Sequence, residues 1–543
     1  MENREKETYE SLEGRLNLEL AWHRVKKDIR RKGYFYHPYE FKLIDYNLDN
    51  WVDELKNEIV EGYEPAYSEI INVYKPHGRL RRGSILNLKD CVVYSSLILD
   101  SIKEIKKAID WSSQNIRFSN NLVDSDGDNW IKPGVNDLKV FRGKLSDLIE
   151  NSYNYVLYTD IKSFYDNIEI QKLESDLTAL GMKDDSKDLL IKCLYKWNQS
   201  GNKGIPQAFK PSDILSEIYM NSIDKKLEKK GITHIRYSDD MRIFCEEKEE
   251  AIDALHTLTR LYKEKELSLQ TSKSFLLEHD KIKNETKIIA ITEESSTNFE
   301  LSFGPSIESD ESPESDESLE SKDPDFSPMD YESEDFSYYG IKLYNIDIED
   351  LLYTFHECLK HVKSENFDKK TFHYVIDRFA RLKVDYALEY CLDLVLLQPH
   401  ETKYILNRYF SSLYNKIEIG EKLVGMLKKG KIKLDHQKYL ILKWILENDI
   451  YSGYILNIMR DFIREAPINH INLDYCIAYL GKYGKDSDYD YIYSFYDKVD
   501  REISQATILI SINGMKNEIR DSIYSQCKDN DCNILAIDYA ESL

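Results

Sequence analysis

The chain has 543 residues, of which 42% are hydrophobic and 31% are charged, and its formal net charge is −23. This length supports about two to four domains of roughly 100 to 200 residues each, which excludes a single small module. No apolar run approaches the ~20 residues of a membrane span, and the charged first residues lack the apolar core of a signal peptide. We therefore expect a cytoplasmic protein with no membrane partner. The eight cysteines form no CxxC pairs, so we expect neither zinc nor disulfides.

Residues 1–292 mix helical and strand patterns, which predicts an α+β fold. Residues 1–73 are expected to form a helical extension, in which Leu18, Ala21, Trp22, Val25 and Ile29 recur at helical spacing on one face. Between residues 74 and 292, the segments VLYTDI (156–161) and HIRYSDDMRIF (234–244) predict strands, because apolar and aromatic residues dominate or alternate in them. Helical stretches separate these strands.

Residues 293–338 form an acidic segment that is rich in Ser, Asp, Glu and Pro. From Glu293 to Asp335 there are 16 acidic residues and one basic residue, Lys322, so the rest of the chain carries a net charge of only −8. Such a segment cannot bury enough apolar surface to offset the entropy lost on ordering. We expect a disordered loop or linker; a nucleic-acid mimic or a phosphorylation target is the alternative.

Residues 339–543 predict an all-α domain. Helical spacing recurs without strand patterns, as in the stretch HQKYLILKWILEN (436–448) and in the set Leu351, Leu352, Phe355, Cys358, Leu359 and Val362. Antiparallel helix pairs, stacked as a helical repeat, would bury these apolar stripes. The sequence has no fixed period, so the repeat is inferred from the helical spacing alone.

Two acidic positions are notable within the expected strands. Asp160 directly follows the segment YVLYT (155–159), and a single Asp in such a place is most often a helix N-cap. Asp239 and Asp240 lie between two alternating segments, which predicts a β-hairpin with adjacent carboxylates at its tip. Carboxylates that converge from two strands suit a pair of magnesium ions about 3.5–4 Å apart, an arrangement that catalyses phosphoryl transfer.

Several motifs over residues 75–280 occur in the order seen in reverse transcriptases. DIKSFYDNI (160–168) resembles the first catalytic motif of that family, GIPQAFKPSDIL (204–215) resembles its GIPxG segment, and YSDD (237–240) matches its YxDD box. LSLQTSKS (267–274) resembles the short segment that ends in a lysine, and residues 74–94 resemble the fingers region. The resemblance implies a right-hand polymerase fold with fingers and palm, and an RNA-directed DNA polymerase activity.

The resemblance also implies roles for individual residues. Asp160 and Asp239 would bind two Mg²⁺ ions, which Mn²⁺ can replace, with help from Asp240 and the carbonyl of Ile161. Tyr165 would lie against the sugar 2′ position and exclude ribonucleotides; an ordinary buried aromatic is the alternative. The other expected nucleotide-binding residues are Pro206, Gln207 and Ala208, the triphosphate-binding candidates Lys75, Arg79, Arg81 and Arg82, and Lys273, which would act on pyrophosphate or simply end a strand at the surface.

The sequence departs from the family pattern at one position of the GIPxG segment. Ala208 stands where the family usually has Gly, and Phe209 follows it. Glycine there lets the backbone approach the nucleotide closely, so the added methyl group and the nearby ring are expected to narrow the template path. This favours short, repetitive or template-independent products.

A reverse transcriptase followed by helical repeats resembles the bacterial abortive-infection and defence-associated group. The resemblance implies antiphage defence, dNTP substrates, an RNA template or noncoding RNA partner and a homo-oligomer. It also allows a DNA product that is primed from, and attached to, a tyrosine. Two alternatives stay open: a retron-like enzyme that copies its own noncoding RNA, and a helical-repeat sensor or scaffold with a vestigial polymerase site.

Overall fold

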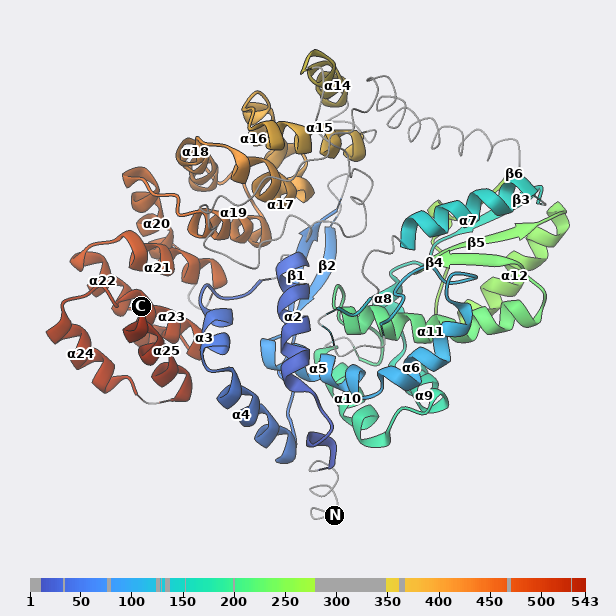
Figure 1. Cartoon of the computed structure of the whole chain (residues 1–543), viewed down its shortest axis with the longest axis horizontal. Helices are drawn as coiled ribbons and strands as arrows, with labels where there is room; N and C mark the ends of the chain where they lie inside the picture. Colours follow the sequence, from blue (N-terminus) through green and yellow to red (C-terminus); the bar gives the residue numbers. More distant parts are fainter. Residues whose placement is uncertain are drawn as a thin grey trace, which may run out of the picture. The chain divides into compact units, whose positions relative to one another are not determined.

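The structure of the protein is a computed structural model, and it describes residues 11–32, 35–75, 80–123, 127, 129–131, 137–151, 153–198, 201–278, 348–360, 367–465, 470–528 and 530–543 (Figure 1). The acidic segment 293–338, Arg79 and Val362 lie outside these residues. The chain divides into two compact units: unit 1 is formed by residues 1–31, 58–68 and 86–345, and unit 2 by residues 32–57, 69–85 and 346–543. Among the described helices, none has both the length and the apolarity that a bilayer crossing requires.

Unit 1 contains the α+β region that the strand patterns predict. Its four-stranded antiparallel sheet has the order β4-β5-β3-β6. The strands are β3 (Tyr155–Thr159), β4 (His234–Tyr237), β5 (Asp240–Cys245) and β6 (Phe275–Glu278). The helices are α2 (Leu18–Lys32), α5 (Leu88–Asp100), α6 (Ile102–Ile109), α7 (Asp137–Asn151), α8 (Phe164–Asn167), α9 (Ile170–Leu180), α10 (Asp184–Trp197), α11 (Lys210–Lys229) and α12 (Lys248–Glu264).

The expected N-terminal helix is present as α2, and all five residues of its predicted apolar face are buried. The two faces of the sheet have different neighbours. Val156, Ile235 and Phe244 form a core with Phe141 and Ile149 of α7 on one face, whereas α12 packs against β3 and β5. Because successive side chains of a strand point to opposite faces of the sheet, they pack in turn against the helices on one face and on the other.

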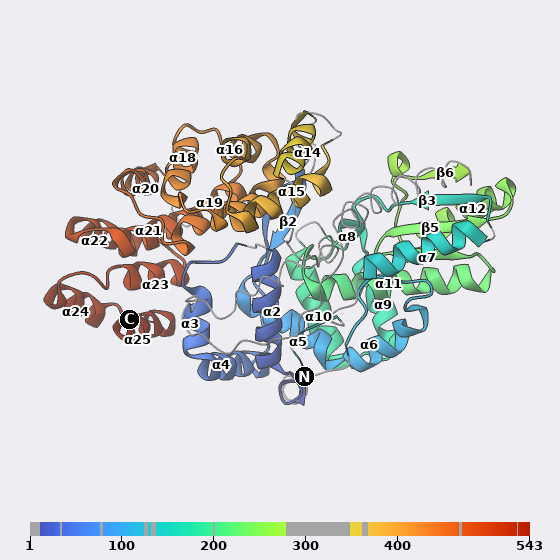
Figure 2. The ribbon, with the colours of Figure 1, turned by 45° about the horizontal axis from the view of Figure 1, so that its top comes forward.

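Unit 2 is largely helical, as the sequence predicts for residues 339–543. Its helices are α14 (Ile348–Lys360), α15 (Lys369–Leu382), α16 (Leu388–Leu397), α17 (Thr402–Tyr404), α18 (Lys416–Lys428), α19 (Asp435–Glu447), α20 (Gly453–Glu465), α21 (Ile471–Tyr483), α22 (Asp486–Tyr493), α23 (Glu502–Ser511), α24 (Asn517–Gln526) and α25 (Asp531–Ser542). Helices α19, α21, α23 and α25 contact one another in that order, and α18 contacts α20. The even-numbered helices form a second row beside them (Figure 2).

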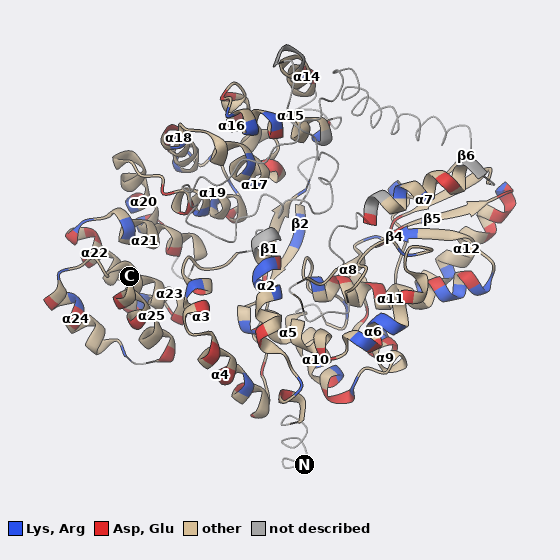
Figure 3. Cartoon of the chain, viewed as in Figure 1, with Lys and Arg blue, Asp and Glu red and all other residues tan. Residues whose placement is uncertain are grey.

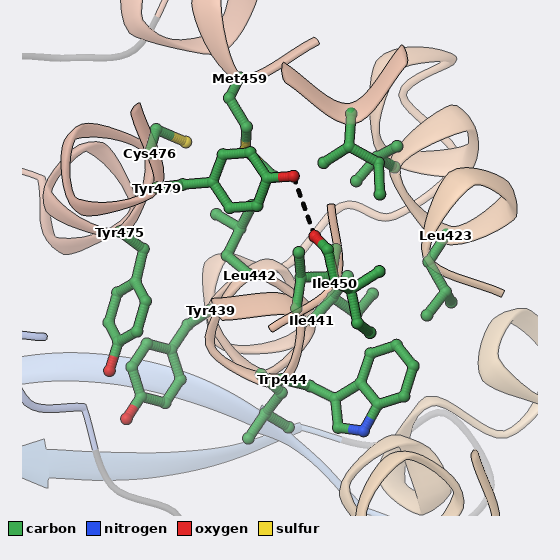
Figure 4. Packing of buried hydrophobic residues seen from close by; sticks show 14 of the residues in the cluster. Leu423, Tyr439, Ile441, Leu442, Trp444, Ile450, Met459, Tyr475, Cys476 and Tyr479 are labelled. Carbon is green, nitrogen blue, oxygen red and sulfur yellow. Dashed lines mark hydrogen bonds between the residues drawn. The ribbon is translucent and has the colours of Figure 1, made fainter. Parts of the chain in front are cut away.

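The core of unit 2 joins successive layers of this repeat. Tyr439 and Trp444 of α19 and Tyr475 and Tyr479 of α21 are buried together (Figure 4). The Tyr479 hydroxyl donates a hydrogen bond of 2.9 Å to the carbonyl of Ile450. The carbonyl of Ile450, which follows α19, is thus satisfied by a side chain of α21, the helix of the next layer. Polar as well as apolar contacts therefore hold the layers together.

Unit 2 also includes two segments from the first 85 residues. One contains α3 (Glu40–Tyr46), and the residues before α3 pack on the repeat: Phe35 stacks on Tyr439, and the His37 imidazole is hydrogen-bonded to Asp474. The other is the antiparallel hairpin of β1 (Glu69–Tyr74) and β2 (Leu80–Ile85). The helix α4 (Leu48–Val60) connects residues of both units.

The described helices carry charges of both signs. Lys and Arg alternate with Asp and Glu along α6, α11 and α12, for example (Figure 3). The concentrated acidity of the sequence belongs to residues 293–338. The local charge at the candidate active site therefore depends on individual pairs of side chains.

Candidate active site

Asp160 is placed by the register of the sheet. Thr159 at the end of β3 pairs with Met241 of β5, so Asp160 leaves β3 opposite Asp240, the first residue of β5. The Asp160 carbonyl accepts a hydrogen bond of 2.8 Å from the Gln270 amide, and Ile161 forms a β-bridge with Leu269. The backbone of this candidate metal ligand is thus fixed on both sides.

Asp239 lies at the tip of the β4–β5 hairpin, as the alternation of the sequence predicts. Tyr237 pairs with Asp240, which leaves Ser238 and Asp239 as a two-residue loop. Ser238 has a φ of 56°, a left-handed conformation that is uncommon for a residue other than glycine. A positive φ at the first loop position is the geometry that two-residue hairpins of type II′ use.

The carboxylates of the site influence one another. Burial, followed by the charge of Asp160, raises the pKa of Asp239 to about 6, and Asp240 contributes in the same direction. Cations lie beside the other two: Lys273 Nζ is 2.9 Å from Asp160 Oδ2, and an Arg242 nitrogen is 3.5 Å from Asp240 Oδ1. The site therefore concentrates negative charge that basic side chains neutralise only in part.

The three carboxylates supply the hard oxygen donors that magnesium prefers. Within the part of the chain that the structure describes, however, no three His, Cys, Asp or Glu side chains form a ready metal-binding group. Lys273 engages Asp160, and the Asp240 side chain, which is 53% exposed, points toward Arg242. The residues fit divalent cations by their chemistry, since a cation would relieve the repulsion that raises the pKa of Asp239.

The alternative reading of Lys273, as a residue that ends a strand, is wrong. It closes the 3₁₀ turn Thr271–Lys273, and β6 follows this turn. The correction has a simple cause: residues 268–270 follow the backbone of residues 160–162 and then turn, which brings Lys273 to Asp160.

The Tyr165 side chain is hydrogen-bonded to helix α11. Its hydroxyl donates a hydrogen bond of 2.8 Å to Asp213 Oδ1, and Lys210 Nζ lies 3.2 Å from the other oxygen of Asp213. Burial, together with Asp213, raises the pKa of the Tyr165 phenol well above its ordinary value. The ring is therefore held neutral and in one orientation, as a residue that shapes a pocket would need to be.

The GIPQAF segment enters α11 directly. Pro206 and Phe209 are buried, whereas Gln207 and Ala208 are partly exposed. The Gln207 amide nitrogen lies 3.2 Å from Asp166 Oδ1, which links this segment to the Asp160 motif. The Phe209 ring is packed at the start of α11 and is only 7% exposed, and its effect on the template path stays a prediction.

Ala208 has a φ of 71°, which explains why a glycine suits this position. A left-handed conformation costs an L-residue roughly 1–2 kcal/mol, whereas glycine adopts it freely but loses more entropy on folding. We expect Ala208→Gly to raise the free energy of unfolding of unit 1 by about 0.5–1 kcal/mol, as measured by thermal denaturation. Ala251→Gly, in the right-handed helix α12, is the control and should destabilise; a loss of stability in both variants would contradict the prediction.

The candidate triphosphate-binding cations lie in unit 2, whereas the aspartates lie in unit 1. Arg81 and Arg82 are exposed on β2, and Lys75 follows β1. Arg79 is outside the described residues. The β1–β2 hairpin presents Arg81 and Arg82 to solvent, and their binding of a triphosphate stays a prediction.

A buried cluster of charged residues between the β4–β5 hairpin and α11 was not predicted from the sequence. Arg236 of β4 is bonded to Glu217 and Asp224 of α11, and all three are at most 1% exposed. Although burial opposes it, the charges of Arg236 and His234 hold the pKa of Asp224 at about 2. The signal was present: in the strand HIRY, His234 and Arg236 alternate with Ile235 and Tyr237, and a charge on the helix-covered face requires a partner.

An antiparallel sheet with acidic residues at the end of β3 and in the adjoining hairpin is the arrangement that the resemblance to a polymerase palm predicts. Residues 73–341 match the model of the family described as reverse transcriptase (RNA-dependent DNA polymerase). This match covers just under half of the chain and indicates a reverse transcriptase domain in residues 73–341.

Similarity to solved structures is remote. The apo telomerase of Candida tropicalis truncated from its C-terminal domain is 13% identical, with 40% of this chain and 51% of that chain covered and a TM-score of 0.29. The telomerase of Candida albicans with a TWJ fragment of telomeric RNA is 11% identical, with 78% and 70% covered and a TM-score of 0.31. The chain thus spans about half the length of the first of these proteins. No curated protein matches the sequence.

Proposed function

We propose that unit 1 synthesises DNA by phosphoryl transfer at a site formed by Asp160 and Asp239, with Asp240 assisting. The observation that carries the proposal is the placement of Asp160 beside Asp239: burial, followed by the charge of Asp160, raises the pKa of Asp239 to about 6, within the region that matches the reverse transcriptase model. Like charges held together on adjacent strands destabilise a protein, and such arrangements are typical of functional sites. The substrates would be dNTPs, and the template would be RNA.

The two carboxylates and the Ile161 carbonyl would hold two divalent ions, Mg²⁺ or Mn²⁺. These ions would lower the pKa of the attacking 3′-hydroxyl and stabilise charge on the triphosphate. Tyr165 would limit the space beside the sugar, because its hydroxyl is tied to Asp213. Pro206, Gln207 and Ala208 would line the nucleotide pocket, and Lys75, Arg79, Arg81 and Arg82 are proposed to bind phosphate.

The test is incubation of the full-length protein with Mg²⁺ and each labelled dNTP, alone and with a primed RNA template. The products are then digested separately with protease and with nuclease. We expect template-dependent incorporation that EDTA stops and that Asp160→Asn abolishes. Incorporation that persists in Asp160→Asn would contradict the proposed site, and a label that shifts on protease digestion would identify a protein-primed product.

Lys273 offers a second test, because its ammonium group engages a proposed metal ligand. The Lys273 end of this ion pair is exposed, and such a pair is worth about 0.2–1 kcal/mol, so Lys273→Ala should tighten Mn²⁺ binding by up to about fivefold. The measurement is a calorimetric Mn²⁺ titration, with Lys172→Ala, whose partner Glu266 lies elsewhere, as the control. Weaker Mn²⁺ binding in Lys273→Ala alone would show that Lys273 supports the ions instead of competing with them.

For the biological role we propose antiphage defence, with a noncoding RNA partner and a homo-oligomeric assembly. The support is the order of the two regions: a reverse transcriptase domain is followed by a largely helical region of stacked layers. Phage should form fewer plaques on cells that express the wild-type chain than on cells that express Asp239→Ala. Equal plaque numbers would remove the defence role, and a discrete RNA-linked DNA on the purified protein would favour a retron-like enzyme.

A further inference from the structure

Ser238, the residue before Asp239, is held at both of its backbone groups by buried side chains. Its amide donates a hydrogen bond of 2.9 Å to the Ser119 hydroxyl oxygen. Its carbonyl accepts one of 3.1 Å from the Arg236 guanidinium. This residue has the left-handed φ of 56°, so the two bonds act on the strained point of the loop.

Both side chains that hold Ser238 are anchored on one carboxylate, that of Glu217 in α11. Arg236 donates to Glu217 Oε2 at 2.5 Å, and the Ser119 hydroxyl donates to Glu217 Oε1. Asn120 donates the third hydrogen bond of this carboxylate, to Oε1 at 2.8 Å. Ser119, Glu217 and Arg236 are 3%, 1% and 1% exposed. A buried carboxylate that accepts three hydrogen bonds has a single favourable position. The Ser238 backbone is therefore held in a fixed place relative to helix α11.

We propose that Ser119, Glu217 and Arg236 are positioning residues for DNA synthesis: they hold Ser238 in its left-handed conformation and thereby fix the place of the Asp239 carboxylate. The inference rests on the proposed function of Asp239. Ser119 and Glu217 lie outside the motifs that point to the reverse transcriptase family, and Arg236 adjoins YSDD.

The two-residue loop of Ser238 and Asp239 has few ways to relax. Without its clamp, Ser238 can leave the left-handed region, and the peptide that links it to Asp239 then rotates. Misplacement of a reacting group by about 1 Å costs roughly 10²-fold in rate. Loss of a group that orients a metal ligand typically costs about 10–100-fold in metal affinity or activity.

The experiment compares three full-length variants. Ser119→Ala removes the hydroxyl, and Ser119→Thr restores it. Ser96→Ala is the matched control, since Ser96 is equally buried and its hydroxyl bonds only to the Val93 carbonyl of its own helix. Hydrogen exchange of the peptide that contains the Ser238 amide reports the clamp directly, without metal or substrate. The kcat and KM for dNTP, measured over a Mg²⁺ titration, report its effect on the reaction.

For Ser119→Ala we expect at least tenfold faster exchange at Ser238, a kcat lower by about 10–100-fold, a higher Mg²⁺ requirement and an unchanged KM for dNTP. Ser119→Thr should recover most of both effects, and Ser96→Ala should show neither. If Ser119→Ala behaves like Ser96→Ala while the wild type is active and Asp239→Asn is inactive, the positioning role is wrong and the proposed function stands. If Asp239→Asn retains wild-type activity, the proposed function itself fails, whatever the exchange data show.

Discussion

Asp239→Asn is expected to abolish nucleotide incorporation, by at least roughly 10³-fold, and to make the metal-free protein more stable. The loss of activity follows because a metal-bound carboxylate contributes several kcal/mol of charge stabilisation to phosphoryl transfer. The gain in stability follows because burial and the neighbouring charge of Asp160 raise the pKa of Asp239 from 3.8 to about 6. One carboxylate would thus serve catalysis at the expense of folding.

The effect of Asp239 on the stability of the metal-free protein depends on pH. Below pH 3.8 Asp239 is protonated in both the folded and the unfolded chain, so it has no effect. As pH rises to about 6, the unfolded chain ionises first, and the metal-free wild type loses up to about 3 kcal/mol of stability. Above this window the loss is complete. Asp239→Asn should therefore match the wild type at pH 4 and melt at a higher temperature at pH 7.

The measurement is thermal unfolding in EDTA over pH 4–8, with dNTP incorporation assayed in parallel. Asp253→Asn, at an exposed position of α12, is the control and should alter neither quantity. Identical melting curves of wild type and Asp239→Asn at every pH would disprove the electrostatic coupling. Retained incorporation would disprove the catalytic role.

The second large effect is expected for Arg236→Leu, which should destabilise unit 1 by about 3–5 kcal/mol. Arg236 is the shared cation of Glu217 and Asp224, and both carboxylates are fully buried. Its removal leaves two buried negative charges without their main partner. Since folded domains are stable by about 5–15 kcal/mol, this is a large part of the total.

Native-state hydrogen exchange of the β3 and β5 amides measures this stability in unit 1 alone. Arg260→Leu, at an exposed position of α12, serves as the control and should change the exchange free energy by less than about 0.5 kcal/mol. A change this small in Arg236→Leu would mean that water or a rearranged side chain replaces the guanidinium. The proposed support of Ser238 by Arg236 would then also fail.

Much of the fold could be predicted because its signals are local. The apolar face of α2, the strand β3 and the β4–β5 hairpin follow from side chains spaced at helical or strand periods, which depend only on backbone geometry. The helical nature of residues 348–543 was readable for the same reason. The Asp239 turn was correctly placed because alternating segments on both sides of Ser238 and Asp239 leave few other registers.

Other features depended on contacts between distant residues. Lys273 and Asp160 are 113 positions apart in the chain, and their pairing follows from the way residues 268–270 run beside residues 160–162. The β1–β2 hairpin precedes the catalytic motifs in sequence, yet it groups with the helical unit. Sequence position gave no indication of this, because a short hairpin can pack on any neighbour that covers its apolar side chains.

By itself, then, the sequence determined the chemistry of the palm: which carboxylates are available, which strands deliver them and which family the motifs resemble. Only the tertiary structure decided how that chemistry is supported. Arg236 read as an ordinary strand residue, and Ser119 and Glu217 were not distinguished at all, because burial and hydrogen bonding arise only when β4, α11 and the segment at Ser119 meet. A periodic pattern reports the face that a residue occupies, whereas the partner it finds there is fixed by packing between elements.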